Sequence, residues 1–183
     1  MDSDLVEEIE YMIDLLSKSG FFDVEEIVEI LEDQFIEEEI DFSKLDNAFK
    51  KLSSEGIVSI HNCGYDISEG VTDAFELRVH LLNNKFDPKG FCFYTFEDVE
   101  DSIFDENLKI TFGDFENDED DALAIGKIVS RCLKDENFNV VWDETVNNQI
   151  EINPFKWDKS YDDEKEYEIE GAYDAFVASQ VSE

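Results

Sequence analysis

Carboxylates dominate the side chains that could do chemistry, and they are densest over residues 114–121, where six of eight residues are acidic. An EF-hand calcium loop places ligands at its first, third and fifth positions, glycine at its sixth and a bidentate glutamate at its twelfth. The first three ligands would be Asp114, Glu116 and Asp118. The sixth and twelfth positions are Glu119 and Ile125, so the calcium interpretation fails twice. The pattern instead indicates a helix that begins after Asn117 or Asp118, because carboxylates interact favourably with a helix N-terminus.

His61 and Cys63 lie two residues apart and have the chemistry of metal ligands. A zinc site needs three or four such ligands, and the sequence offers no second pair to complete one. Cys92 lies in an apolar run and Cys132 on one face of a predicted helix. We therefore expect no metal and no cofactor, and a turn at His61 that carries a partly exposed thiol.

The other sequence motifs of catalysis are missing. The sequence contains no GxSxG, no phosphate-binding loop and no GxGxxG. His80 is the second of only two histidines, and its helical surroundings predict a place in the core. Acidic pairs occur throughout the chain, so any two of them would imitate a glycosidase dyad without specificity. No catalytic residue is assigned, and the sequence favours a protein that is not an enzyme.

The net charge of -35, from 49 acidic and 14 basic residues, is spread along the whole chain. Nucleic acids and anionic membranes are recognised through uncompensated lysines and arginines, so this composition argues against both. The same charge attracts basic proteins over long distances. The chain opens with acidic residues where a leader would be basic, and no apolar run approaches the roughly 20 residues of a membrane span. We expect a cytoplasmic protein with reduced thiols.

Helical spacing of apolar residues predicts three helices in the first third of the chain. Their ranges are 2–20, 22–39 and 41–56. Asp23 and Ser43 are the expected N-caps of the second and third helices. Residues 57–67 then predict a short hairpin around the turn HNCG, and residues 68–84 a fourth helix. The result is a helical subdomain over residues 1–87 with a winged-helix outline, whose third helix has too many acids among its lysines to bind DNA.

The pattern changes after residue 87 and predicts a second subdomain over residues 88–157. Its strands are expected at 91–96, 108–113, 138–143 and 149–155. One helix capped by Thr95 and one that follows the acidic residues should separate the first three strands, in the order β-α-β-α-β-β. Residues 158–183 are an acidic segment with a possible short helix over 172–179. The predicted fold class is α+β, a helical part with a hairpin followed by a mixed sheet with packed helices.

Two segments have a distinctive composition: FYTFEDVE from Phe93 to Glu100, and VVWD from Val140 to Asp143. With the segments around them, from about residue 19 to 157, they resemble an uncharacterised family of bacterial proteins, a domain of unknown function. Many members of that family carry additional cysteines near the position of Cys63, where this chain has only the one. A metal site in those relatives would not carry over to this chain. The resemblance implies the architecture and no activity.

Strong charge without a catalytic constellation favours a non-catalytic binding protein that neutralises a basic partner, as an immunity protein or antitoxin does. The candidate contacts are Asp118, Glu119, Asp120 and Asp121, then Glu29, Glu32, Asp33 and Glu37, with Trp157 and Tyr161 as aromatic anchors. The alternative is a small-molecule-binding or enzymatic domain with a carboxylate-lined pocket. Acids on a convex face would indicate the first function, and acids around a concavity the second.

Overall fold

The computed structural model describes residues 3–21, 26–27, 40–162 and 165–181. The chain divides into two compact units, residues 1–38 and residues 39–183. The first contains helix α1 (Ser3–Ser19), which confirms the first predicted helix, and Gly20 follows it with a positive φ of 71°. The second predicted helix, over residues 22–39, lies almost wholly outside the described residues.

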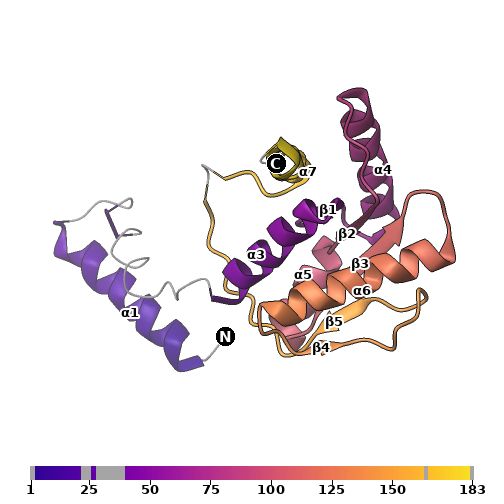
Figure 1. The fold of residues 1–183 in the computed structure, drawn as a ribbon. Coiled ribbons are helices and arrows are strands. Elements are labelled where there is room, and N and C mark those ends of the chain that lie inside the picture. Colours follow the sequence, from indigo (N-terminus) through magenta and orange to yellow (C-terminus); the bar gives the residue numbers. More distant parts are fainter. Residues whose placement is uncertain (1–2, 22–25, 28–39, 163–164, 182–183) are drawn as a thin grey trace. The chain divides into compact units, whose positions relative to one another are not determined.

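The second unit is an α+β fold in which helices pack on a five-stranded mixed sheet (Figure 1). Its helices are α3 (Ile40–Ser54), α4 (Ile67–Asn83), α5 (Phe96–Asp105), α6 (Glu119–Asp135) and α7 (Ile169–Val181). Its strands are β1 (Ile57–Ile60), β2 (Gly90–Phe93), β3 (Leu108–Asp114), β4 (Val140–Val141) and β5 (Ile150–Ile152). From β2 to β5 the elements follow the predicted order β-α-β-α-β-β.

The strands are arranged in the order β1-β2-β3-β5-β4, with β1 and β2 parallel and the other pairs antiparallel. Ile57 pairs with Gly90 and Ile60 with Phe93. The predicted hairpin is therefore wrong, because the HNCG turn leads into α4 and the partner of β1 is β2. All four residues of β1 are buried, as in a parallel strand covered on both faces. The sheet thus runs across the subdomain boundary that the sequence suggested near residue 87.

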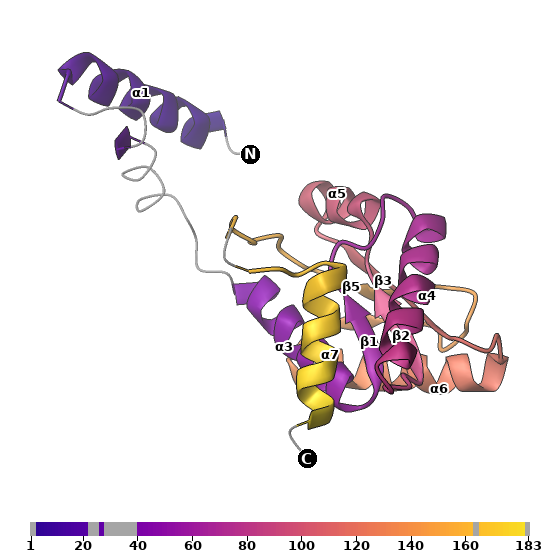
Figure 2. The same cartoon turned by 90° about the horizontal axis from the view of Figure 1, so that it is seen from above.

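Helices cover both faces of the sheet, and alternate residues of β2 point to each. On one face, α3 and α6 pack over a cluster that includes Cys92 and Tyr94. On the other, α4 and α7 enclose Phe91 and Phe93. Figure 2 shows α7 beside α3, with α4 on its other side. The aromatic run of β2 is buried on both faces, which confirms the prediction made from its composition.

Local sequence explains where two of the helices begin. Thr95 caps α5 in a capping box with Asp98, as its spacing predicts. Asp118 caps α6, and its carboxylate accepts from the backbone N–H groups of Asp120 and Asp121. Each cap satisfies N–H groups that a helix leaves without intrahelical partners.

The cap of α3 was not foreseen. The helix begins at Ile40, so Ser43 lies inside its first turn and the predicted cap is wrong. Asp158, from the segment after β5, accepts instead from the backbone N–H groups of Ile40, Asp41 and Phe42 at 2.8, 2.8 and 2.9 Å. A carboxylate more than a hundred residues away therefore holds the start of this helix.

Helix α7 shows that the acidic C-terminal segment contributes to the fold. It is longer than the short helix suggested at residues 172–179, and Ala172 and Phe176 are buried against the sheet and α4. Phe176 is among the largest fully buried side chains of the protein. The segment that joins β5 to α7, residues 155–162 and 165–168, is called the strap below.

Candidate functional site

The residues singled out in the sequence lie at opposite ends of the parallel pair β1–β2. His61 and Tyr94 directly follow the carboxyl ends of the two strands. Gly90, at the amino end of β2, pairs with Asp114, the last residue of β3, so the acidic turn that follows lies at the opposite end. Ligands of open α/β sheets bind in crevices outside the carboxyl ends of parallel strands. The carboxyl end of this pair is therefore the first place to look for a site.

His61 is buried at this end and sits between two partners. Its Nδ1 lies 3.0 Å from the hydroxyl oxygen of Tyr94. Its Nε2 lies 3.5 Å from Oδ1 of Asp46 on α3, and this contact does not complete a hydrogen bond. The backbone N–H of Cys63 donates to the Tyr94 carbonyl at 2.8 Å, which fixes the two strand ends to each other. One nitrogen of a buried imidazole is thus left with an unfilled hydrogen bond.

The electrostatics of the group favour uncharged rings. Burial lowers the pKa of His61 by more than the neighbouring Asp46 raises it. Burial also raises the pKa of Tyr94 well above its usual value. Burial would raise the pKa of Asp46 as well, but the nearby His61 and the hydrogen bond from Lys50 lower it overall, so its carboxylate stays charged. A neutral imidazole beside a carboxylate carries its proton on the facing nitrogen, so Nδ1 of His61 accepts from Tyr94.

Two cavities adjoin His61. The smaller, of about 260 Å³, reaches toward α3 and is lined by Asp46 and Lys50 among others. The larger, of about 450 Å³, is lined by Tyr94 and by strap residues including Trp157 and Tyr161. His61 and three strap residues border both: Lys165, Glu166 and Tyr167. The larger volume lies within the range of small-molecule sites.

The strap forms one wall of this region and is anchored at several points. Asp158 caps α3, and Asp41 accepts from the backbone N–H of Lys156 at 3.1 Å. Further along, Asn62 donates to the carboxylate of Glu168 at 2.8 Å. These contacts join segments about a hundred residues apart. Sequence periodicity cannot reveal pairs so far apart, and the strap shows only acidic, polar and scattered aromatic residues in the sequence.

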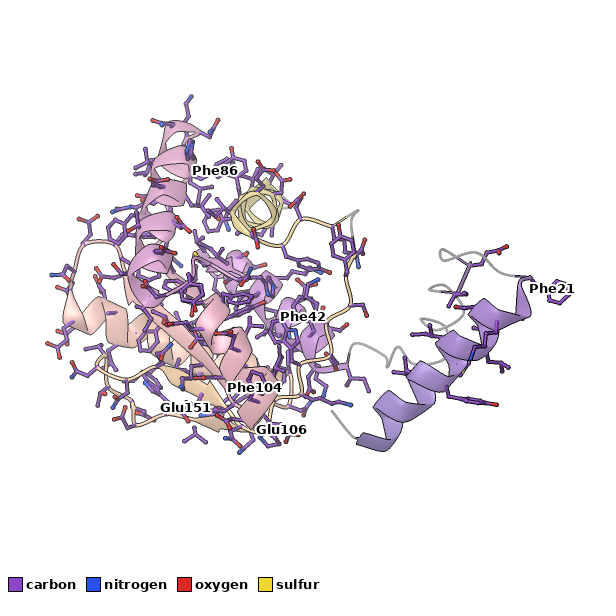
Figure 3. All side chains as sticks on the ribbon, turned by 180° about the vertical axis from the view of Figure 1, so that it is seen from behind. Phe21, Phe42, Phe86, Phe104, Glu106 and Glu151 are labelled. Carbon is purple, nitrogen blue, oxygen red and sulfur yellow. The ribbon has the colours of Figure 1, made fainter. Side chains whose placement is uncertain are left out.

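Aromatic rings gather around Phe42 on α3, which Figure 3 labels. The ring of Phe42 lies 5.2 Å from Tyr167, 5.3 Å from His61 and 6.0 Å from Trp157, centroid to centroid. The ammonium of Lys159 lies 5.3 Å from the centroid of Phe42 and 4.8 Å from that of Tyr167. These distances are those of cation–π contacts. The group of Phe42, His61, Tyr94, Trp157 and Tyr167 is called the aromatic box.

Two smaller expectations about histidine and cysteine are wrong. Cys63 is buried rather than partly exposed, and its thiol donates to the carbonyl of Gly70. Burial raises the pKa of Cys63 to about 12 and that of Cys92 to about 12, so neither is a thiolate near neutral pH. His80, expected in the core, is exposed on α4.

At the amino end, the predicted acidic contacts have different structural roles. Asp118 is used as the cap of α6, and Asp114 accepts from the backbone N–H groups of Glu116 and Asp118. Glu119, Asp120 and Asp121 are exposed in the first turn of α6. Glu29, Glu32, Asp33 and Glu37 lie outside the described residues.

The two predicted aromatic anchors lie at the other end, in the strap. Trp157 is half-buried against Tyr94 and Phe155, and Tyr161 is 91% exposed at the rim of the larger cavity. The structure therefore does not bring the acids of residues 118–121 and the predicted aromatics into one surface.

An exposed apolar face on α4 was missed in the sequence. Phe75 is 40% exposed, Val79 56% and Leu82 43%, and Val71 adjoins them in a mostly apolar hollow. These four residues are called the α4 strip. Their spacing of four, four and three could have revealed it, because α4 has a second apolar face besides the buried one of Ala74, Leu77 and Leu81.

The α4 strip adjoins the acidic turn through the loop that follows β3. Arg78 donates to the carbonyl of Phe115 and pairs with the carboxylate of Glu116. The ring of Phe75 packs on that of Phe115 at 5.3 Å. Glu76 is exposed beside Phe75 on α4. An apolar strip with acids around it therefore extends from α4 toward the start of α6.

Two negative observations apply to the described part of the chain. No group of three or more His, Cys, Asp or Glu side chains there is arranged to hold a metal ion. No helix among the same residues has both the length and the apolar composition to cross a lipid bilayer.

Comparison with known proteins agrees with the resemblance seen in the sequence. No curated protein and no solved structure matches the chain. One family model, described as a domain of unknown function (DUF6891), matches residues 36–161. This range covers α3 through β5 and the first part of the strap, and therefore includes His61, Tyr94 and Asp158. Since the match spans well over half of the 183 residues, the chain belongs to the DUF6891 family.

Proposed function

We propose that the protein is a non-catalytic binding module that neutralises a basic protein partner, in the manner of an immunity protein or antitoxin. The observation that supports it best is the α4 strip, an exposed apolar face with Glu76 beside it on α4 and Glu116 in the adjoining loop. Protein interfaces combine an apolar centre with a polar rim, and the best-packed centre contributes most of the affinity. The strip would supply the centre, and the surrounding acids would select a basic partner.

Crowded carboxylates on α4 strengthen the case for a basic partner. Burial raises the pKa of Asp73, and the neighbouring charges of Glu76 and Glu69 raise it further. The acids of this helix therefore repel one another, and a cation placed among them would relieve that repulsion. Glu119, Asp120 and Asp121 extend the same negative field toward the start of α6. A protein of net charge -35 would also steer a basic partner toward itself before contact.

The test compares two matched substitutions in a capture experiment. Val79→Asp places a charge in the α4 strip, and Ile103→Asp places one on α5, where Ile103 is 55% exposed and belongs to neither site. Each full-length variant is immobilised and then incubated at low salt with extract from the native cell. Bound proteins are eluted with rising salt and identified by mass spectrometry.

The proposal predicts a basic protein that wild type and Ile103→Asp retain and that Val79→Asp binds about tenfold or more weakly. Equal retention by both variants would refute the assignment to the α4 strip. If the captured partner is acidic, or if its release does not depend on the salt concentration, the electrostatic part of the proposal is refuted.

One observation favours the alternative, a small-molecule-binding domain. The larger cavity lies at the carboxyl end of the β1–β2 pair, next to a buried imidazole with an unfilled hydrogen bond. This location and this incomplete hydrogen bonding are typical of ligand sites. The two functions use opposite ends of the sheet, so they are compatible in one protein.

A further inference from the structure

We propose that the aromatic box is a binding site for a small organic cation of the methylated ammonium class, which takes the position now filled by the ammonium of Lys159. The inference goes beyond binding of a basic protein, and it gives the carboxyl-end cavity a chemical class of ligand. It depends on where Lys159 lies, on what surrounds it and on the charge of His61.

Lys159 is a cation held mainly by aromatic faces. Its ammonium lies over the rings of Phe42 and Tyr167. Within the described part of the chain it pairs with no carboxylate, and the carbonyl of Ser160, at 2.9 Å, is the one oxygen that accepts from it. The side chain is half-buried, so solvent can accept from its remaining N–H groups, and the protein itself holds the cation mainly through ring faces.

The ring faces around Lys159 indicate the kind of cation. A methylated ammonium has few or no N–H groups to satisfy and is recognised through aromatic faces. The faces that meet the cation are those of Phe42 and Tyr167, and the other rings of the box support them edge to face, as His61 does for Tyr167 at 5.6 Å. The adjoining cavity of about 450 Å³ leaves room for the rest of a small ligand.

The charges around the box fit a cation as well. Burial keeps His61 neutral, so the imidazole adds no positive charge to the box. Asp162, Glu166 and Glu168 line the larger cavity together with Lys165, which pairs with Asp162 at 3.3 Å, so carboxylates still outnumber the one other lysine and attract a cation. Lys159 is only half-buried and ends a flexible four-carbon stem, so it can leave the box for solvent without unfolding the strap.

The experiment compares choline with 3,3-dimethyl-1-butanol, its neutral counterpart of nearly the same shape. Binding of each probe to the full chain is measured by isothermal titration and by saturation-transfer NMR. Lys159→Ala empties the box, whereas Lys156→Ala removes the same charge from an exposed strap position outside the cavity lining. The two variants separate an emptied box from a general change of charge.

We expect choline to bind Lys159→Ala several-fold more tightly than it binds wild type or Lys156→Ala. Choline should also exceed its neutral counterpart by roughly two- to thirtyfold, the range that cation–π contacts give. Equal binding of the two probes would overturn the proposal, because shape alone would then explain the site. No binding of choline to Lys159→Ala, with its thermal unfolding unchanged, would overturn it too.

A second pair of variants tests the aromatic face itself. Tyr167→Phe keeps the ring and Tyr167→Leu removes it, while both lose the hydroxyl. Choline affinity should be kept in the first and fall in the second, and equal affinity in the two would count against the box. Neither outcome depends on capture of a basic protein by the α4 strip, so failure of this inference and failure of the proposed function are distinguishable.

Discussion

The two ends of the β1–β2 pair use an acidic sequence in opposite ways. At the amino end, Glu119, Asp120 and Asp121 are exposed and act on whatever approaches from solvent. At the carboxyl end, Asp46 and Asp158 are partly buried and each faces a specific group of the protein, an imidazole ring in one case and a helix N-terminus in the other. Solvent and salt screen the first set strongly and the second set weakly.

Net charge by itself therefore does not locate a site. The carboxylates that determine local structure are those with defined partners, and they are few. The larger number of exposed acids sets the long-range field and therefore the kind of partner. Variants that alter one end and leave the other unchanged can test this difference.

The largest effect is expected from removing the two helix caps, one at each end. Asp158→Ala removes three backbone hydrogen bonds to α3 and should lower the free energy of unfolding by about 2 kcal/mol or more. Asp118→Ala removes the exposed cap of α6 and should cost about 1 kcal/mol. Chemical denaturation of the two variants and wild type measures both values.

Choline binding is a second measurement that distinguishes the two cap variants. Asp158→Ala should also weaken choline binding, because the strap that carries Trp157 and Lys159 loses its anchor, whereas Asp118→Ala should leave it unchanged. Equal losses of stability with unchanged choline binding would contradict the idea that the strap is held through α3.

Asp158 also shows where prediction from sequence ends. Thr95, Asp98 and Asp118 act within three residues of their own helices, so their capping roles could be predicted from spacing. The cap of α3 depends on a residue 118 positions from Ile40, and nothing local in the sequence encodes it. Ser43 had the right chemistry for a cap, but the helix starts earlier because the strap supplies a better acceptor.

The same limit explains the hairpin error and the missed site. Ile57–Ile60 has the composition of a buried strand, and its partner, β2, lies thirty residues away across α4. Once that pairing is known, His61 and Tyr94 become neighbours and a cavity at their strand ends is expected. The elements from β2 to β5 could be predicted from the sequence because each has a periodic pattern or a continuous apolar run and is bounded by local turns or caps.

A smaller, pH-dependent effect is expected at His61. The pKa of the folded ring is lowered from 6.5, so below about pH 6.5 the unfolded chain binds a proton that the folded chain does not. The contribution of His61 to stability is therefore lost as the pH falls through that window, by at most about 1.4 kcal/mol per pH unit. His61→Gln, which keeps an acceptor for Tyr94, should remove this part of the dependence.

The pH experiment compares denaturation of wild type and His61→Gln between pH 7 and pH 5. The informative quantity is the difference between the two proteins in free energy of unfolding at each pH, because protonation of the many exposed carboxylates affects both proteins alike. If wild type gains stability relative to His61→Gln as the pH falls, the imidazole is charged in the folded protein. That result would contradict the uncharged His61 on which the aromatic box depends.

The smallest effect on folding, and the sharpest contrast between the ends, is expected from neutralising exposed acids. The triple change Glu119→Gln, Asp120→Asn and Asp121→Asn should alter the free energy of unfolding by less than about 1 kcal/mol, since these side chains act only on the N-terminus of α6. It should slow association with the captured basic partner by about three- to tenfold at low salt, and much less at high salt. Stopped-flow association measures the rate.

Its matched control removes the same charge near the other end of the sheet. Glu97, Glu100 and Asp105 are exposed on α5, which begins just after the carboxyl end of β2, and they are changed to the corresponding amides. If the partner docks on the α4 strip, the control should slow association less than the first triple variant, because its charges lie farther from the docking face. If the two triple variants slow association equally, the negative field of the whole protein steers the partner. The acids of α6 would then not be specific contacts of the interface.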